Sequence, residues 1–111
     1  MTAGEVIRRF DDLHRNAMPL SLKLESIASL ESRIARELGF TAPITVTEES
    51  SLIAADHAEI YYLYLCSRLD FENGDFDRFN NDMAVFAESY SAFAAGVVRS
   101  RNRGGRIKVG S

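Results

Sequence analysis

The side chains best suited to chemistry in this 111-residue chain are one cysteine, two histidines and a group of carboxylates. Cys66, His14 and His57 are far apart in the sequence, and none has companions at the spacing of a metal site. His57 and Glu59 stand two residues apart, so they do not face each other on a helix. A cysteine nucleophile needs a base and an orienting acid. Cys66 falls on the apolar face of a predicted helix, and we interpret it as a small buried residue.

Carboxylates gather in one segment, and their order decides what they can bind. The five are Asp70, Glu72, Asp75, Asp77 and Asp82. Because they lack the ligand order of a calcium-binding loop, the pattern favours a solvated acidic face over a cation site. Gly104-Gly105 is not a phosphate loop, since no strand precedes it and no helix follows. We therefore expect no enzyme activity, no metal and no cofactor.

Charge is distributed unevenly along the chain. The net charge is −3. Residues 1–98 hold 8 Lys or Arg and all 16 Asp and Glu, a net charge of −8, whereas residues 99–111 hold five basic residues and no acid. This asymmetry indicates that the two parts meet different surfaces. No apolar run is long enough to cross a membrane, the charged N-terminus argues against a signal peptide, and a single cysteine fits a reducing compartment.

Four helices are predicted from periodicity and capping signals. Thr2-Ala3-Gly4-Glu5 has the form of a capping box and opens a first helix that must end before Pro19. A second helix is expected over residues 21–38, with Gly39 at its C-terminus. A third begins at an N-cap Asp56 and ends at Asn73-Gly74. Asp75 caps the fourth.

The fourth helix carries the most regular apolar seam in the sequence. Its members recur at alternating intervals of three and four residues, an a/d pattern that other helices must cover. They are Phe76, Phe79, Met83, Phe86, Tyr90, Phe93 and Val97. Residues 40–55 contain the β-branched run Ile44–Thr47, which predicts an ordered, extended loop or a strand that pairs with another chain. The predicted fold is all-α: a small four-helix bundle of two helical hairpins with an extended central loop.

The C-terminal segment differs in composition from the rest of the chain. We divide the chain into a helical domain, residues 1–98, and an extended basic arm, residues 99–111, which is too poor in apolar residues to fold alone and should become ordered on a partner. Ile107 and Val109 alternate with Lys108, as in a strand that adds to another sheet. The residues expected to dock this arm are Arg99, Arg101, Arg103, Arg106, Ile107, Lys108 and Val109.

Several segments together resemble a family of small tailed-bacteriophage proteins, the head–tail connectors, also called adaptor or head-completion proteins. The resemblance covers most of residues 5–95. It lies in residues 5–13 with Asn16, residues 30–34, 56–65 and 69–75, and residues 78–86 with Tyr90. Arg78-Phe79-Asn80-Asn81 is its most specific part. The chain departs from the family at residues 95–100, where relatives carry aromatic residues and an Asn-Arg pair, and its tail is richer in Arg.

The resemblance implies a structural virion protein at the neck, assembled in the host cytoplasm. Such proteins form a ring of identical subunits, commonly twelve, beneath the portal protein, and offer a platform for the stopper or tail-completion protein. The ring extends the channel for double-stranded DNA without sequence-specific binding. On that basis the five carboxylates between residues 70 and 82 would suit a channel wall that repels DNA, and the basic arm would grip the portal.

Two other functions are compatible with the sequence. A small helical nucleic-acid-binding regulator would use the basic tail, and its affinity should then fall steeply with salt. The acidic body and the lack of a recognisable helix-turn-helix argue against that function. A helical adaptor of a cellular protein, such as an antitoxin or chaperone, is the third hypothesis, which the neighbouring genes would test.

Overall fold

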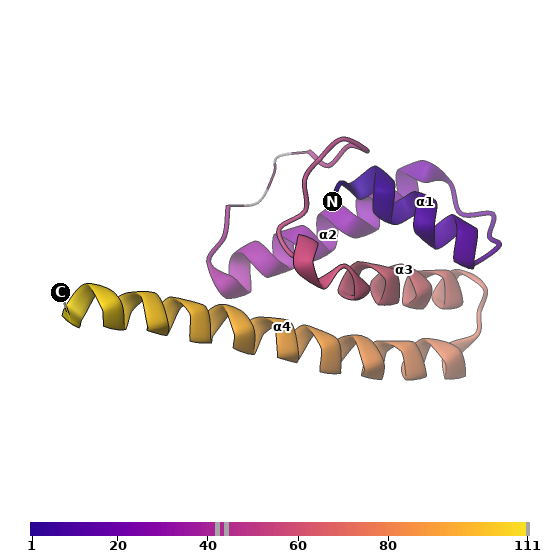
Figure 1. Cartoon of the computed structure of the whole chain (residues 1–111). Coiled ribbons are helices and arrows are strands. Elements are labelled where there is room, and N and C mark those ends of the chain that lie inside the picture. Colours follow the sequence, from indigo (N-terminus) through magenta and orange to yellow (C-terminus); the bar gives the residue numbers. More distant parts are fainter. Residues whose placement is uncertain (42, 44, 111) are drawn as a thin grey trace.

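The computed structural model describes the backbone of residues 1–41, 43 and 45–110, and the side chains of these residues as far as Asn102. The helices are α1 (Ala3–Leu13), α2 (Leu20–Leu38), α3 (Glu59–Glu72) and α4 (Phe76–Gly110), with a 3₁₀ turn, η1 (Ala55–His57), before α3. They form two hairpins, α1–α2 and α3–α4, and α3 lies between α4 and the other pair (Figure 1). The predicted all-α bundle is confirmed.

Capping signals fixed most helix ends correctly. Thr2 Oγ1 accepts a hydrogen bond from the Glu5 amide at 3.2 Å, so the predicted N-cap of α1 is present. Gly39 ends α2 with a φ of 73°, a left-handed conformation that glycine adopts without strain. Asp75 Oδ1 accepts from the Arg78 amide at 3.2 Å and caps α4. The predicted Asp56 cap is wrong: η1 occupies its place, and α3 starts at Glu59 without a side-chain cap.

The central loop runs across the N-terminus of α1. The amides of Ala3 and Gly4, which no helical carbonyl can satisfy, donate to Ser50 O at 2.9 Å and Glu48 O at 2.8 Å. An isolated antiparallel β-bridge joins Thr2 and Ser51, and no other β-bridge occurs among the residues described. The loop is thus ordered by α1 of its own chain. Ile44, the first residue of the predicted extended run, lies outside the described residues.

Apolar side chains from all four helices and the loop share one core. Phe10, Leu30, Ile34 and Leu65 are fully buried within it. Of the predicted seam, Phe86, Tyr90 and Phe93 are buried, whereas Phe79, Met83 and Val97 are partly exposed. Phe76 is 58% exposed. The seam is therefore covered within the chain by α2, α3 and the loop, except at its start.

The backbone of residues 99–110 is helical and continues α4, which differs from the extended arm predicted for residues 99–111. No break marks the predicted boundary after Val98. No proline interrupts residues 99–110, and four arginines in this stretch favour helix, although Gly104 and Gly105 do not. The end of α4 lies clear of the other helices (Figure 1). Ser111 and the side chains of the docking residues Arg103, Arg106, Ile107, Lys108 and Val109 fall outside the described part.

Candidate interaction surfaces

The turn between α3 and α4 carries an exposed aromatic cluster, which we call the hairpin tip: Phe71, Phe76 and Phe79 with the exposed acids Glu72, Asp75 and Asp77. The rings of Phe76 and Phe79 lie 5.9 and 5.7 Å from that of Phe71. Phe71 is 48% exposed even though the Arg68 guanidinium lies 5.8 Å from its ring. An exposed apolar cluster with a polar rim is typical of a protein contact.

The predicted acidic face is divided by the fold. Glu72, Asp75 and Asp77 are exposed, but Asp70 is only 7% exposed and lies against α4 near Asp82. Burial, together with the neighbouring Asp82 carboxyl, raises the pKa of Asp70 to about 6. Asp70 Oδ2 has no hydrogen-bond partner among the described residues. Asp70 therefore belongs to the packing between α3 and α4 and not to a surface that could face DNA.

A groove of about 480 Å³ lies between the central loop and the second half of α4. We call it the α4 groove. Its apolar walls come from Phe40, Ile53, Ala54, Phe93, Gly96 and Val97, and its polar groups from Asp56, His57, Ser100 and Arg101. The Arg101 guanidinium lies over the Phe40 ring at 5.0 Å. Arg101, predicted as part of a free arm, thus contacts the body, although both Arg101 and Arg99 are exposed.

Beside this groove, a polar clamp joins α2 to α4. Tyr90 Oη donates to Glu37 Oε1 at 2.7 Å, and Arg33 Nε lies 3.1 Å from the same oxygen. The Arg33 guanidinium also lies 4.5 Å from the centre of the Tyr90 ring. Burial and the hydrogen bond to Glu37 raise the pKa of Tyr90 to about 12, so the hydroxyl stays protonated. The clamp fixes the direction of α4 relative to the bundle.

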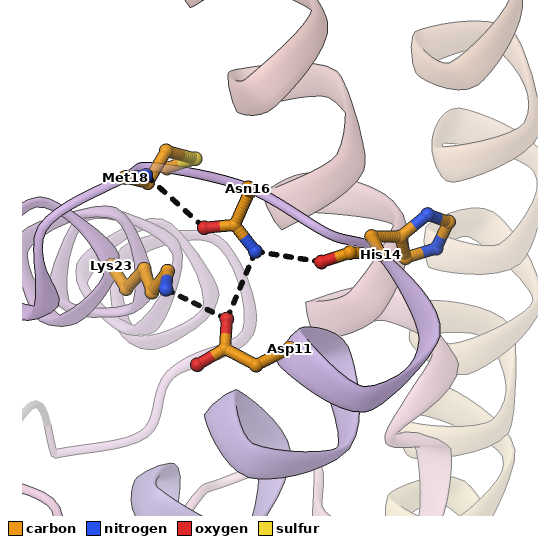
Figure 2. A network of polar contacts seen from close by, with 5 residues as sticks. All are labelled: Asp11, His14, Asn16, Met18 and Lys23. Atoms are coloured by element: carbon orange, nitrogen blue, oxygen red, sulfur yellow. Dashed lines mark hydrogen bonds and ion pairs between the residues drawn. The ribbon is translucent and has the colours of Figure 1, made fainter.

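The connection between α1 and α2 contains a second polar network (Figure 2). The Asn16 amide donates to Asp11 Oδ1 at 3.0 Å and to His14 O at 2.8 Å, and Lys23 Nζ pairs with Asp11 at 2.7 Å. Burial alone would raise the pKa of Asp11, but these hydrogen bonds outweigh it and hold the pKa below its usual value. The network connects the end of α1 to the start of α2 through Asn16 and Asp11.

The fold also joins two residues that sequence spacing separated. His14 Nε2 lies 3.4 Å from Cys66 Sγ, so two residues that are far apart in the sequence are neighbours in the fold. Burial raises the pKa of Cys66 to about 11, however, and the group remains a thiol at neutral pH. In the described part of the chain, no three His, Cys, Asp or Glu side chains gather as metal ligands would. The pair brings the end of α1 into contact with α3.

Glu31 is a buried polar residue whose burial the sequence did not predict. It is 1% exposed on α2, and its carboxylate accepts hydrogen bonds from the Ile53 amide at 2.9 Å and from Tyr61 Oη. Tyr61 Oη in turn accepts from the Ala54 amide at 3.0 Å. These bonds attach the end of the central loop, and with it one wall of the α4 groove, to α2 and α3.

Comparison with known proteins adds no relative. No protein-family model matches the chain, and neither a curated protein nor a solved structure resembles it significantly. None of the helices as described is long and apolar enough to cross a membrane. The functional argument therefore depends on the residues and surfaces above.

Proposed function

We propose that this chain is a head–tail connector of a tailed bacteriophage, forming a ring beneath the portal protein and extending the DNA channel. The observation that carries the proposal is the shape and charge of α4. This helix of 35 residues contributes Phe86, Tyr90 and Phe93 to the core and continues beyond the bundle with its basic last third. A ring subunit needs such a division, because its body must pack with neighbours while a projecting element reaches the component above.

Opposite charges at the turn between α3 and α4 and at the C-terminal end of α4 support distinct contacts. Residues 70–82 hold five carboxylates and one arginine, whereas residues 99–108 hold five basic side chains and no acid. Exposed Glu72, Asp75 and Asp77 would repel DNA in a channel and let it slide. The basic end would dock on the portal, with the stopper or tail-completion protein binding the opposite face of the ring. The resemblance through residues 5–95 supplies the identity of these partners.

Co-sedimentation with purified portal-containing capsids from the same genome tests the proposal. The full-length chain should bind saturably, near one copy per portal subunit. A truncation after Val98 should lose binding, and so should one after Asn102, which keeps Arg101 on Phe40. Binding that survives both truncations would move the contact to the helical body. Absence of capsid binding together with retention on DNA would replace the connector by the regulator.

A charge-matched pair of variants separates a docking role from a general charge effect. Arg103→Ser, Arg106→Ser and Lys108→Ser together remove three positive charges from the end of α4. Arg8→Ser, Arg9→Ser and Arg15→Ser remove three from exposed positions near α1. Only the first triple variant should lose capsid binding. Equal losses in both would show that overall charge, not the α4 end, governs the association.

A further inference from the structure

The hairpin tip and the α4 groove have complementary properties. Phe76 is the most exposed aromatic side chain in the described part, and acids surround it. The groove offers apolar walls in Phe40, Phe93 and Val97 and has Arg101 at its edge. Its volume of about 480 Å³ falls in the range of roughly 300–1,000 Å³ that is usual for pockets that accept organic groups. One surface is a projecting apolar group and the other is a recess.

A single chain cannot bring these two surfaces together. Phe76 and Gly96 lie on the same continuous helix, twenty residues apart. At 1.5 Å per residue the separation is about 30 Å, and the helix is rigid on that scale. The hairpin tip of one molecule can therefore reach only the α4 groove of another.

We infer that the hairpin tip of one copy of this chain inserts Phe76 into the α4 groove of the next copy. Charge favours this occupant: residues 71–79 of the tip have three exposed acids and one arginine, and residues 96–103 have three arginines and no acid. Asp56 is the one carboxylate lining the groove, and His57 lies beside it. The structure already uses the same chemistry, since Arg33, Arg68 and Arg101 each lie over an aromatic ring.

Such a contact joins different surfaces of identical subunits and is heterologous. Heterologous contacts repeat, and they close into a ring when the rotation between subunits permits or continue as a filament when it does not. The inference thus rests on the proposed function for its ring geometry and names the subunit contact of that ring. It also leaves residues 103–110 available to the portal, because the groove lies before them.

Sedimentation velocity of the full-length protein without any portal tests the contact, from micromolar to millimolar concentration. The wild type should form species larger than a dimer as concentration rises. Phe76→Ser should weaken association about 10- to 100-fold, the range expected when the burial of one phenyl ring is lost. Val85→Ser is the matched control, because Val85 is also an exposed apolar residue of α4 but lies outside both surfaces. Equal weakening by both variants would overturn the inference.

Gly96 allows the groove to be blocked without disturbing the fold. A Cβ at this position meets no atom within 4 Å. Gly96→Trp should fill the groove and abolish association, and Gly96→Ala should leave it intact. A groove variant that still associates like the wild type would contradict the proposed contact.

A charge exchange gives the most specific test. Asp77→Arg and Arg101→Asp should each weaken association by about tenfold, because each creates a like-charge contact. The double variant should recover most of the loss, since its reversed tip meets a reversed groove on the next copy. A double variant that stays weak would overturn the inference. A wild type that sediments as a monomer at every concentration would also overturn the inference. If Gly96→Trp then lost capsid binding, the groove would be assigned to the portal contact. The connector function would still stand in that case.

Discussion

Glu31 and Tyr61 show how one pair of side chains can hold a surface in place. Glu31 accepts from the Ile53 amide and from Tyr61 Oη, and Tyr61 Oη accepts from the Ala54 amide. Burial and the bond to Glu31 raise the pKa of Tyr61, so its hydroxyl remains a donor at every physiological pH. A buried carboxylate is tolerated only when such donors replace its water. Here they do so while positioning Ile53 and Ala54, which line the α4 groove.

Tyr61→Phe should therefore destabilise the protein. The substitution keeps the ring but leaves Glu31 without one donor and the Ala54 amide without its acceptor. Each unsatisfied buried group costs about 1–3 kcal/mol, so the free energy of unfolding should fall by at least that amount. The midpoint of urea denaturation at pH 7, with an unchanged slope, measures the effect.

Tyr62→Phe provides the control on the same helix. Tyr62 Oη is buried and has no hydrogen-bond partner among the described residues. Removing this hydroxyl should leave stability within about 0.5 kcal/mol of the wild type or increase it, because no hydrogen bond is lost. A Tyr62 variant as unstable as the Tyr61 variant would show that loss of any buried hydroxyl, and not the Glu31 network, is responsible.

Asp70 predicts a distinct dependence of stability on pH. Its folded-state pKa of about 6 exceeds its ordinary value of 3.8. Between these pH values the folded chain binds more protons at Asp70 than the unfolded chain does, so this residue makes the protein less stable as pH rises from about 4 to 6. Asp70→Asn removes that penalty. It should raise the free energy of unfolding at pH 7 by up to roughly 3 kcal/mol, since the pKa differs by about two units and each unit corresponds to about 1.4 kcal/mol.

Urea denaturation of both proteins at intervals from pH 4 to pH 8 checks this expectation. The difference between them should shrink steadily as pH falls from 7 to 4, because Asp70 becomes protonated first in the folded state and then in the unfolded state. Asp12→Asn, at an exposed carboxylate of α1, is the control for the loss of one negative charge. A constant advantage of Asp70→Asn at all pH values would point to packing instead of protonation.

At the scale of elements, the central loop acts as a cap for α1. Its carbonyls at Glu48 and Ser50 accept the first helical amides, and Leu52 N donates to Met1 O at 3.3 Å. The close approach of the central loop to α1 requires a glycine at position 4. A Cβ there would lie 2.8 Å from Glu48 O, a backbone atom that cannot turn aside as a side chain would. The loop and α1 therefore have to move apart to accommodate any larger residue.

Gly4→Ala and Gly96→Ala should consequently have opposite effects, although both replace a helical glycine. Gly4→Ala should lower the free energy of unfolding by about 1–3 kcal/mol through overpacking. Gly96→Ala should raise it by roughly 0.5–1 kcal/mol, because alanine is the better helix former and its Cβ meets open space. Thermal or urea unfolding of the two variants measures the difference. Stabilisation by Gly4→Ala would mean that the loop does not approach α1 this closely.

The sequence predicted the helices well because their signals are local. Caps, seam spacing and glycine ends all lie within a few residues of the boundaries that they mark. The polar core was missed because its partners are distant: Glu31 meets Ile53 and Tyr61 across 22 and 30 residues. Asp70 likewise reads as a surface acid until α4 folds back over it. The α4 groove could not be predicted from periodicity, since two of its walls come from an irregular loop.

At the scale of the whole molecule, α4 sets both the shape and the electrical polarity. The described residues extend 54 × 30 × 22 Å, and a helix of 35 residues spans about 52 Å. The long axis thus runs from an acidic, aromatic end to a basic end. The body, with a charge of −8, repels DNA, whereas the end, with a charge of +5, attracts it. Because these effects oppose each other, we expect no tight binding to DNA.

This polarity predicts weak, non-specific DNA binding that salt abolishes. With five basic side chains available, the logarithm of the binding constant should fall with the logarithm of salt concentration at a slope of about −4 to −5. A truncation after Asn102 removes three of the five, so the slope should become shallower by about 3. Fluorescence anisotropy with a labelled duplex from 50 to 200 mM salt measures both slopes. Binding that depended on the sequence of the duplex would favour a regulator over a connector, because a channel protein gains nothing from holding the DNA that must pass it.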